Sequence, residues 1–386
     1  MARNHRIVIV GAAIAGLTAA ETLRAEGFSG DITLVGEEAH LPYSRPPLSK
    51  QVLLDDWSAD KTTIKSLEEL NELGINFLSK TRAIKLNLNE KIIITNFGTG
   101  VLFDALIIAT GTMPRKVTLD GGIPTLRTID DSISLRSQMQ KAKRIAVLGS
   151  GVLGSEIASA AVSLGSTVAL IGRSSNLSFG AVGVALSSRI EKLHLDNGVD
   201  LRLRRTLTQI ASVDNQKRLI FSDGEELTTD FIVAAIGGYP TTDWLKDSGL
   251  AIDDGVICDS NGEAAPGVYA IGDVAAWPDS VTGLPRRIEH QSNAIEQAIA
   301  VAQRIMNDSI PKTPVPFFWS EIHGARIKAY GWFDSEPLAV LQQSPSTGEL
   351  LASGGAEAVS GIVAWNLPPK EFLKARLLVE NSLAKE

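Results

Sequence analysis

Cysteine is almost absent from this sequence, since Cys258 is the only one among 386 residues. A chain with one cysteine forms neither an intramolecular disulfide nor a Cys-x-x-Cys redox pair. Catalysis through a disulfide within the chain is therefore excluded. Histidine is also scarce, and its five positions, 5, 40, 194, 290 and 323, show no metal-ligand spacing. We therefore expect no metal site.

The sequence also lacks an excess of positive charge and long hydrophobic runs. A net charge of -7 and a pI near 5.4 argue against binding to nucleic acids or anionic membranes, which favour basic surfaces. No run of about 18 charge-free apolar residues marks a membrane span. The opening "MARNHRIVIVGAAIAGL" imitates a signal peptide, but the spacing of Gly11 and Gly16 favours a first strand and helix. We expect a cytoplasmic protein.

An internal repeat organises the chain. Residues 6–38 and 144–175 each read as an apolar strand, a glycine turn, an alanine-rich helix and a second apolar strand. The β-branched runs "RIVIV" and "RIAVL" suit strands that are buried on both faces of a parallel sheet. Two such βαβ units predict an α/β fold with two nucleotide sites.

The glycine turns of the two copies differ at one position. In the second copy Gly149, Gly151 and Gly154 complete the pattern G-x-G-x-x-G, which brings a pyrophosphate close to the backbone at a helix N-terminus. In the first copy Ala13 replaces the middle glycine, so we expect the pyrophosphate to lie slightly farther away. A glycine turn can also be a plain connector, but two copies in the same frame make that the minority interpretation.

Other segments complete the predicted architecture. The segment at 266–275 is expected to be a strand that delivers Asp273 at its carboxyl end. The prolines and aromatic residues of "SIPKTPVPFFWS", 309–320, mark a boundary, and a smaller α+β tail is expected from about residue 313. Further apolar strands are expected at 103–111 and 229–240, and antiparallel hairpin elements at 91–98 and 218–227.

A set of ordered motifs resembles the FAD-dependent ferredoxin reductases that serve bacterial Rieske oxygenases and cytochromes P450. The motifs include "VGAAIAGL", "PYSRPPLSK", "GSGVLGSE", "VYAIGDVA" and "FFWS", and the resemblance spans almost the whole chain. These reductases are glutathione-reductase-like flavoproteins that bind two dinucleotides. The resemblance implies two Rossmann-like domains, for FAD and NAD(P), and a small C-terminal α+β domain. The expected boundaries are 1–112 and 242–312 for FAD, 113–241 for NAD(P), and 313–386 for the last domain.

The resemblance also implies site residues. Lys50 and Glu156 are the implied catalytic pair beside the flavin, although Glu156 could instead be an ordinary acid at a helix start. The implied FAD-binding residues are Gly11, Ala13, Ile14, Ala15, Gly16, Glu37, Arg45, Lys50, Ala83, Thr110, Gly111, Arg127, Asp273, Gln291 and Trp319. The implied NAD(P)-binding residues are Gly149, Gly151, Val152, Leu153, Gly154, Glu156, Arg173, Ser174 and Gly237.

The implied activity is transfer of a hydride from NAD(P)H to FAD and then of single electrons to a [2Fe-2S] ferredoxin. Because no thiol relay is present, an external one-electron carrier is the expected acceptor. The protein is expected to be a monomer or a homodimer. A peroxide-forming oxidase and a flavoprotein resembling apoptosis-inducing factor are the alternatives. Trp319 and a basic rim are candidates for the ferredoxin dock, the rim being Arg286, Arg287, Arg326 and Lys328. Gln291, where the family often has tryptophan, and "WSEIHG" depart from the family pattern.

One residue bears on the choice between NADH and NADPH. Aligned by their strands, the two copies place Glu37 of "LVGEE" opposite Arg173 of "LIGRSS". An acid accepts the ribose 2′-hydroxyl of NADH, whereas a 2′-phosphate favours arginine and hydroxyl donors such as Arg173, Ser174 and Ser175. We therefore favour NADPH, while a solvated Arg173 with a ribose held by backbone alone is the alternative.

Overall fold

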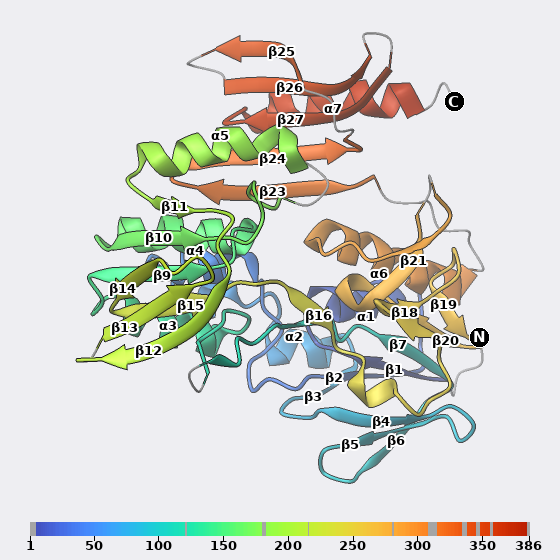
Figure 1. Cartoon of the computed structure of the whole chain (residues 1–386). Coiled ribbons are helices and arrows are strands. Elements are labelled where there is room, and N and C mark those ends of the chain that lie inside the picture. The colour runs from blue at the N-terminus through green and yellow to red at the C-terminus, as the bar shows by residue number, and fades with distance from the viewer. Residues whose placement is uncertain are drawn as a thin grey trace. The chain divides into compact units, whose positions relative to one another are not determined.

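The computed structural model describes residues 5–119, 122–179, 183–214, 216–279, 282–307, 315–333, 338–344, 348–355 and 358–383. The chain divides into two compact units (Figure 1). The first unit consists of Met1–Ser44, Asp60–Met113 and Gly238–Pro314, and the second of Arg45–Ala59, Pro114–Gly237 and Val315–Glu386. The expected division into three domains stays a prediction. Among the described residues, no helix is both long and apolar enough to cross a membrane.

The first unit is built on a six-stranded sheet in the order β19-β20-β7-β1-β2-β3. All neighbouring strands are parallel except the edge strand β19. Its central strands are buried apolar runs, as expected for a parallel sheet covered on both faces. The bounds are β1 Arg6–Val10, β2 Asp31–Val35, β3 Ile75–Leu78, β7 Ala105–Ile108, β19 Glu263–Ala265 and β20 Val268–Ala270.

Two helices of the first unit, α1 (Ile14–Ala25) and α6 (Gln291–Asn307), pack against each other and share the hydrophobic core of the sheet. The remaining elements form two smaller sheets and short helices. These are β4 Ala83–Asn87, β5 Ile92–Thr95, β6 Gly100–Leu102, β17 Ile252–Asp253, β18 Gly255–Ile257, β21 Ala275–Pro278, β22 Pro285–Arg286, α2 Leu67–Glu72, η2 Ala59–Thr62, η5 Asp243–Leu245 and η6 Gly272–Val274.

The second unit repeats the parallel arrangement with the order β11-β10-β9-β15. An antiparallel sheet of β12, β13 and β14 lies between β11 and β15 in the chain, so hairpins occur where the sequence predicted them in both copies. The bounds are β9 Arg144–Leu148, β10 Thr167–Ile171, β11 Asp200–Arg202, β12 Leu207–Val213, β13 Gln216–Phe221, β14 Glu226–Thr229, β15 Phe231–Ala234, α3 Ile129–Met139, α4 Val152–Ser163, α5 Gly183–Asp196 and η1 Pro46–Ser49. Short strands β8 (Thr112–Pro114) and β16 (Gly238–Pro240) lie where the chain passes between the units.

The C-terminal part of the second unit is a five-stranded antiparallel sheet in the order β23-β24-β27-β26-β25. One helix, α7 (Pro369–Leu383), packs on it. The predicted α+β tail and the α/β class of the chain are therefore confirmed. The bounds are β23 Phe317–Ile322, β24 Ala325–Gly331, β25 Ala339–Ser344, β26 Gly348–Gly355 and β27 Ala358–Trp365.

Both βαβ copies carry the same ion pair at the start of their first strand. The Arg6 guanidinium donates to both oxygens of Asp104, at 3.2 and 3.1 Å, and the Arg6 backbone N–H donates to the same carboxylate at 2.8 Å. In the second copy Arg144 binds Asp230 in the same three ways. These hydrogen bonds from Arg6 lower the pKa of Asp104 to about 2.

The Asp104 ion pair predicts an acid-dependent loss of stability. Because the folded pKa lies below the reference value of 3.8, the stabilisation is present above that pH and is lost as the pH falls towards about 2. Since both side chains are partly exposed, we expect Asp104→Asn to cost about 1 kcal/mol at pH 6, and the difference to shrink below pH ~4. Urea unfolding as a function of pH measures it. Asp196→Asn, at an exposed pair with Lys192, is the matched control, and an equal cost in both variants would contradict the prediction.

Candidate functional site

The first glycine of each turn is required by the backbone. Gly11 and Gly149 have φ values of +114° and +111°, in the region that side chains disfavour. A Cβ atom on either would lie 2.1 Å from a backbone carbonyl oxygen, that of Ala109 or of Ala235. The two turns therefore bring the chain equally close to the next strand of the sheet.

The third glycine lets each helix approach its own turn. A Cβ on Gly16 would lie 1.9 Å from the carbonyl oxygen of Gly11, and one on Gly154 would lie 1.8 Å from that of Gly149. No other residue fits without moving α1 or α4. These four glycines fix where the two helices begin.

The middle position is different, because a side chain fits there. Ala13 and Gly151 share one extended backbone conformation, with φ of -84° and -87°. A Cβ on Gly151 would meet only the carbonyl oxygen of Ser178, at 3.5 Å. The alanine of the first copy therefore follows the same path as the glycine of the second.

Both helices begin without a side chain that caps them. The backbone N–H groups of the first turn then remain available to an anion, and the helix dipole favours negative charge at that end. These first turns contain Ile14 and Ala15 in α1, and Val152 and Leu153 in α4. The residues present therefore fit the pyrophosphate of a dinucleotide at both turns.

The residues that follow the second strands lie at equivalent places. The N–H of Gly36 donates to the carbonyl of Leu78 at 2.9 Å, and the N–H of Gly172 donates to that of Arg202 at 3.0 Å. The next residues, Glu37 and Arg173, are both exposed. The correspondence of Glu37 with Arg173 thus holds in space as well as in sequence.

Arg204 is a neighbour of this position that the sequence did not reveal. It has a left-handed backbone, with φ of +58°, and its N–H donates to the carbonyl of Ser174 at 3.1 Å. Lys80 makes the same contact with Glu38 in the first copy, also at 3.1 Å and with φ of +52°. The signal was the arginine run "LRLRR" at 201–205.

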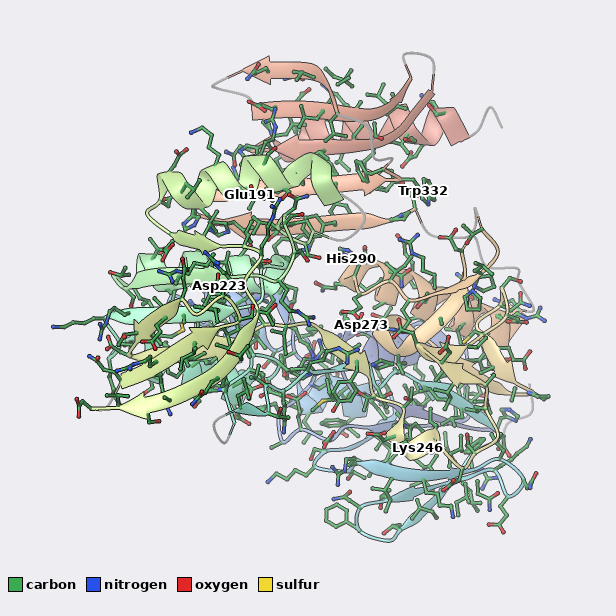
Figure 2. All side chains as sticks on the ribbon, in the orientation of Figure 1. Glu191, Asp223, Lys246, Asp273, His290 and Trp332 are labelled. Atoms are coloured by element: carbon green, nitrogen blue, oxygen red, sulfur yellow. The ribbon has the colours of Figure 1, made fainter. Side chains whose placement is uncertain are left out.

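Two other arginines of that run are already paired. Arg202 binds Asp200 at 2.8 Å, and Arg205 binds Asp223 and, at 3.1 Å, Glu225 (Figure 2 labels Asp223). For Arg173 and Arg204, the described part of the chain provides no ion pair. Exposed positive charge therefore remains at the carboxyl end of β10.

Lys50 and Glu156 form a buried ion pair in the second unit, with Lys50 Nζ 2.7 Å from Glu156 Oε1. Lys50 is 8% exposed and Glu156 is 7% exposed. Glu156 lies on α4, two residues after Gly154, and Lys50 follows the proline-rich helix η1. The structure therefore brings together the two residues that the resemblance implied as a pair.

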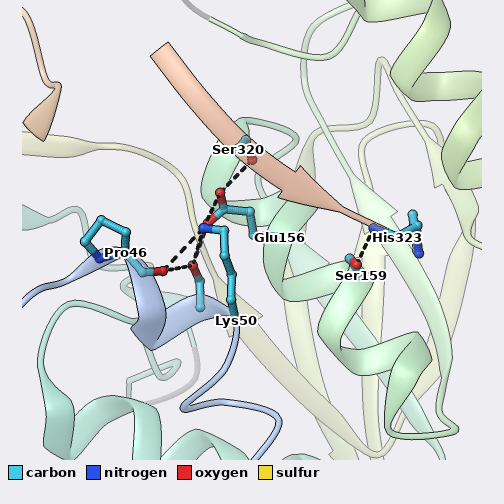
Figure 3. Close-up of polar contacts among 7 residues, drawn as sticks. Pro46, Lys50, Glu156, Ser159, Ser320 and His323 are labelled. Carbon is cyan, nitrogen blue, oxygen red and sulfur yellow. Dashed lines mark hydrogen bonds and ion pairs between the residues drawn. The ribbon is translucent and has the colours of Figure 1, made fainter. Parts of the chain in front are cut away.

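Two serine hydroxyls complete the surroundings of Glu156, and sequence reasoning missed both. Ser320 of β23 donates to Oε1 at 2.6 Å (Figure 3). Ser49 of η1 donates to Oε2 at 2.5 Å. The Lys50 ammonium also lies 5.0 Å from the centre of the Trp319 ring. Trp319 is therefore part of the Lys50 environment, and its side chain is partly exposed.

The end of β23 is attached to two helices. The His323 backbone N–H donates to Ser159 Oγ on α4 at 2.7 Å, as Figure 3 shows. The His323 Nε2 atom lies 3.0 Å from His194 Nδ1 on α5. Burial, with His323 beside it, lowers the pKa of His194 to about 3. His194 is therefore neutral at physiological pH.

Asp273 lies beside the first turn of α1. It belongs to η6, just after β20, and a Cβ on the preceding Gly272 would lie 3.3 Å from the Cβ of Ala15 (Figure 2 labels Asp273). The strand is shorter than the expected 266–275, since β20 ends at Ala270, but Asp273 follows its carboxyl end as predicted. Gln291 begins α6, which packs on α1.

The remaining expected FAD residues are divided between the units. Thr110 donates its hydroxyl to the carbonyl of Thr241 at 2.9 Å, Gly111 follows it, and Ala83 is buried at the start of β4. These lie in the first unit with Glu37. Arg45 and Arg127 lie in the second unit with Lys50 and Trp319, and Arg45 donates to the Arg127 carbonyl at 2.6 Å. Gly237, which was expected to bind NAD(P), is also in the second unit.

The expected basic rim is wrong at Arg287. Its side chain is 8% exposed and binds Asp254 at 3.2 Å and Glu289 at 2.9 Å. Arg286 binds Asp279 at 3.1 Å, whereas Arg326 is exposed. Ion pairs with Asp279, Asp254 and Glu289 neutralise the first part of the rim.

Cys258 is buried, and burial raises the pKa of its thiol to about 12. The reactive form of cysteine is the thiolate, which is scarce at such a pKa. Cys258 is therefore a core residue, as the sequence argument against thiol chemistry requires.

Comparison with known proteins places these features in a family context. The model of the pyridine nucleotide-disulphide oxidoreductase family matches residues 5–298. The benzene 1,2-dioxygenase system ferredoxin--NAD(+) reductase subunit of Pseudomonas putida is 32% identical, over 98% of this chain and 92% of the relative. A rubredoxin-NAD(+) reductase of Pseudomonas putida is 31% identical, over 89% of this chain and 91% of the relative. The crystal structure of a covalent putidaredoxin reductase-putidaredoxin complex is similar with a TM-score of 0.90 and 26% identity, covering 98% and 94% of the two chains.

The glycine geometry predicts different effects of two neighbouring substitutions, one on stability and the other on nucleotide binding. Gly154→Ala forces a Cβ to within 1.8 Å of a carbonyl oxygen, so it should destabilise the second unit by about 1–3 kcal/mol. Gly151→Ala has space for its methyl group and should fold normally, but should weaken binding of the nicotinamide dinucleotide. Thermal unfolding and nucleotide titration measure the two effects. Equal decreases in the unfolding temperature of both variants would contradict the prediction that only Gly154→Ala destabilises the unit.

Proposed function

Since the chain belongs to the pyridine nucleotide-disulphide oxidoreductase family, we propose that it is an FAD-dependent NAD(P)H:ferredoxin oxidoreductase. Its ferredoxin would supply an oxygenase or a cytochrome P450. The observation that carries the proposal is the presence of two equivalent dinucleotide turns in a chain whose single cysteine is a buried core thiol. The named activities of the relatives support it.

FAD is assigned to the first unit, where, when bound, it accepts a hydride and releases single electrons. The N–H groups at the start of α1 bind its pyrophosphate. Asp273, beside that turn, offers carboxylate oxygens to sugar hydroxyls, and Glu37 does the same for the adenosine ribose. Ala83, Thr110, Gly111, Arg45, Arg127 and Gln291 remain proposed cofactor contacts by the resemblance.

By the resemblance, the Lys50–Glu156 pair is proposed to act on the reacting ends of the dinucleotides. Lys50 places a positive charge where electron density arrives, in a buried position where charge is weakly screened. Glu156 holds that charge in place and offers an acceptor to the nicotinamide carboxamide. No general base is needed, so these residues act by orientation and electrostatics.

The electron acceptor is proposed to be a [2Fe-2S] ferredoxin. A buried thiol cannot relay electrons, so the electrons would pass directly to an external acceptor, which we propose to be a one-electron carrier. One relative is named as a reductase of a ferredoxin and another as a reductase of a rubredoxin. The choice of a ferredoxin over a rubredoxin is therefore a separate step of the proposal.

NADPH is proposed as the preferred nucleotide, although the relatives named above are NAD(+) reductases and give this preference no support. The proposal depends on the exposed Arg173 and on Arg204, whose N–H binds the carbonyl of Ser174. Two guanidinium groups and the neighbouring serines suit a 2′-phosphate better than a hydroxyl.

The acceptor is tested by steady-state turnover. NAD(P)H consumption by the holoenzyme should be faster with a [2Fe-2S] ferredoxin than with rubredoxin or with O2 alone. Arg326→Glu should slow ferredoxin reduction and reduce its dependence on salt, because an acidic partner meets an exposed arginine. Arg218→Glu, on β13, is the control of equal charge change. Equal turnover with O2 would instead favour the peroxide-forming oxidase.

The nucleotide preference is tested by comparing kcat/KM for NADPH and NADH. Arg173→Glu should lower the value for NADPH by about 10–100-fold, because a charge-assisted hydrogen bond is lost. The value for NADH should not fall and should rise if the new carboxylate accepts the ribose 2′-hydroxyl. Arg204→Glu should act in the same direction. Arg218→Glu again controls for net charge, and a native preference for NADH would overturn the NADPH proposal.

A further inference from the structure

We propose that Ser49 and Ser320 are positioning residues that hold the Glu156 carboxylate in one orientation against Lys50. The inference rests on the proposed function, in which the Lys50–Glu156 pair acts on the reacting ends of the dinucleotides. It adds two residues whose hydroxyl groups act on the reaction only through that carboxylate.

The four groups form one buried cluster in the second unit (Figure 3). Glu156 Oε1 accepts from Lys50 Nζ at 2.7 Å and from Ser320 Oγ at 2.6 Å, and Oε2 accepts from Ser49 Oγ at 2.5 Å. Ser49 is 4% exposed and Ser320 is 1% exposed. Water therefore cannot readily replace either hydroxyl as a donor.

The three donors restrict what Glu156 can still accept. A carboxylate has about four acceptor positions, of which the cluster uses two on Oε1 and one on Oε2. One position on Oε2 stays available for an external donor. Ser49 and Ser320 bind opposite oxygens, so together they oppose rotation of the carboxylate, which Lys50 alone would leave possible.

Each hydroxyl comes from a backbone with little freedom. Ser49 ends η1, whose first residues Pro46 and Pro47 have fixed φ angles. Ser320 lies inside β23, where alternation directs it inward while the neighbouring Trp319 is partly exposed. The two donors are therefore held in place before any ligand binds.

Ser49 also reaches Lys50. The ammonium lies 3.4 Å from Ser49 Oγ and 3.3 Å from the Pro46 carbonyl oxygen, and 5.0 Å from the centre of the Trp319 ring. Loss of the Ser49 hydroxyl would thus loosen both members of the ion pair. The indole of Trp319 is a natural reporter of where the ammonium lies.

The competing explanation is that the hydroxyls only join segments of the chain. Two other hydroxyls do this without touching Glu156. Ser132 Oγ donates to the Leu48 carbonyl at 2.7 Å, next to Ser49, and Ser159 Oγ accepts from the His323 N–H at 2.7 Å, at the end of β23. Ser132→Ala and Ser159→Ala are therefore matched controls for Ser49→Ala and Ser320→Ala.

The first measurement is stopped-flow reduction of the flavin in the holoenzyme. Ser49→Ala and Ser320→Ala should each lower the rate constant at saturating NAD(P)H by about 10-fold, with KM changed much less, because orientation of a reacting group is lost. The two controls should keep the native rate constant. Equal losses in the controls and the test variants would overturn the proposal.

The second measurement places each substitution in a Glu156→Gln background. If the hydroxyls act through the carboxylate, they should add little to the loss that Glu156→Gln already causes. A full additional 10-fold loss in that background would overturn the positioning role.

The third measurement does not depend on activity. The ¹⁹F resonance of Trp319 in 5-fluorotryptophan-labelled holoenzyme, assigned with Trp319→Phe, should shift or broaden in Ser49→Ala and stay unchanged in Ser132→Ala. An unchanged resonance in Ser49→Ala would overturn the proposal. If Lys50→Ala reduces flavin at the native rate, the proposed function of the ion pair fails instead, and the resonance still decides whether Ser49 positions it.

Discussion

Both units depend on the close approach of a glycine turn to the backbone of the neighbouring strand. At Gly11, Gly16, Gly149 and Gly154 a Cβ atom would lie about 2 Å from a carbonyl oxygen, so the geometry admits only hydrogen there. The constraint sets the start of α1 and α4 against their sheets, and it leaves the first-turn N–H groups uncapped. Anion-binding capacity is thus a direct result of backbone packing and needs no charged side chain.

In the second unit this packing also positions a buried ion pair. Glu156 lies just after the turn on α4, so the turn that would receive one dinucleotide also fixes the carboxylate. Burying an ammonium and a carboxylate is costly unless further hydrogen bonds satisfy them. Here the hydroxyls of Ser49 and Ser320 provide them, and they attach η1 and β23 to the same helix. The hydrogen bonds that satisfy the buried Glu156 carboxylate therefore hold α4, η1 and β23 together.

The sequence predicted the features that have local patterns. Glycine spacing, buried strands and the repeat itself identified both turns, and they placed Asp273 and the correspondence between Glu37 and Arg173 correctly. It could not predict contacts between distant segments, such as those of Glu156 with Ser49 and Ser320, 107 and 164 residues away. Serine is too common for its position to signal such a contact. The burial of Arg287 was missed because its contact with Asp254, which is 33 residues away, depends on the tertiary fold, although Glu289 is only two residues away in the sequence.

The burial of Cys258 has a consequence for the durability of the protein. Reduced flavoproteins that meet oxygen can generate peroxide, and peroxide oxidises exposed cysteine thiolates to sulfenic and higher acids. The only thiol of this chain is buried and stays protonated, with a pKa of about 12. The protein thus presents no easily oxidised cysteine to peroxide, and this resistance to thiol oxidation follows from the packing of one core side chain.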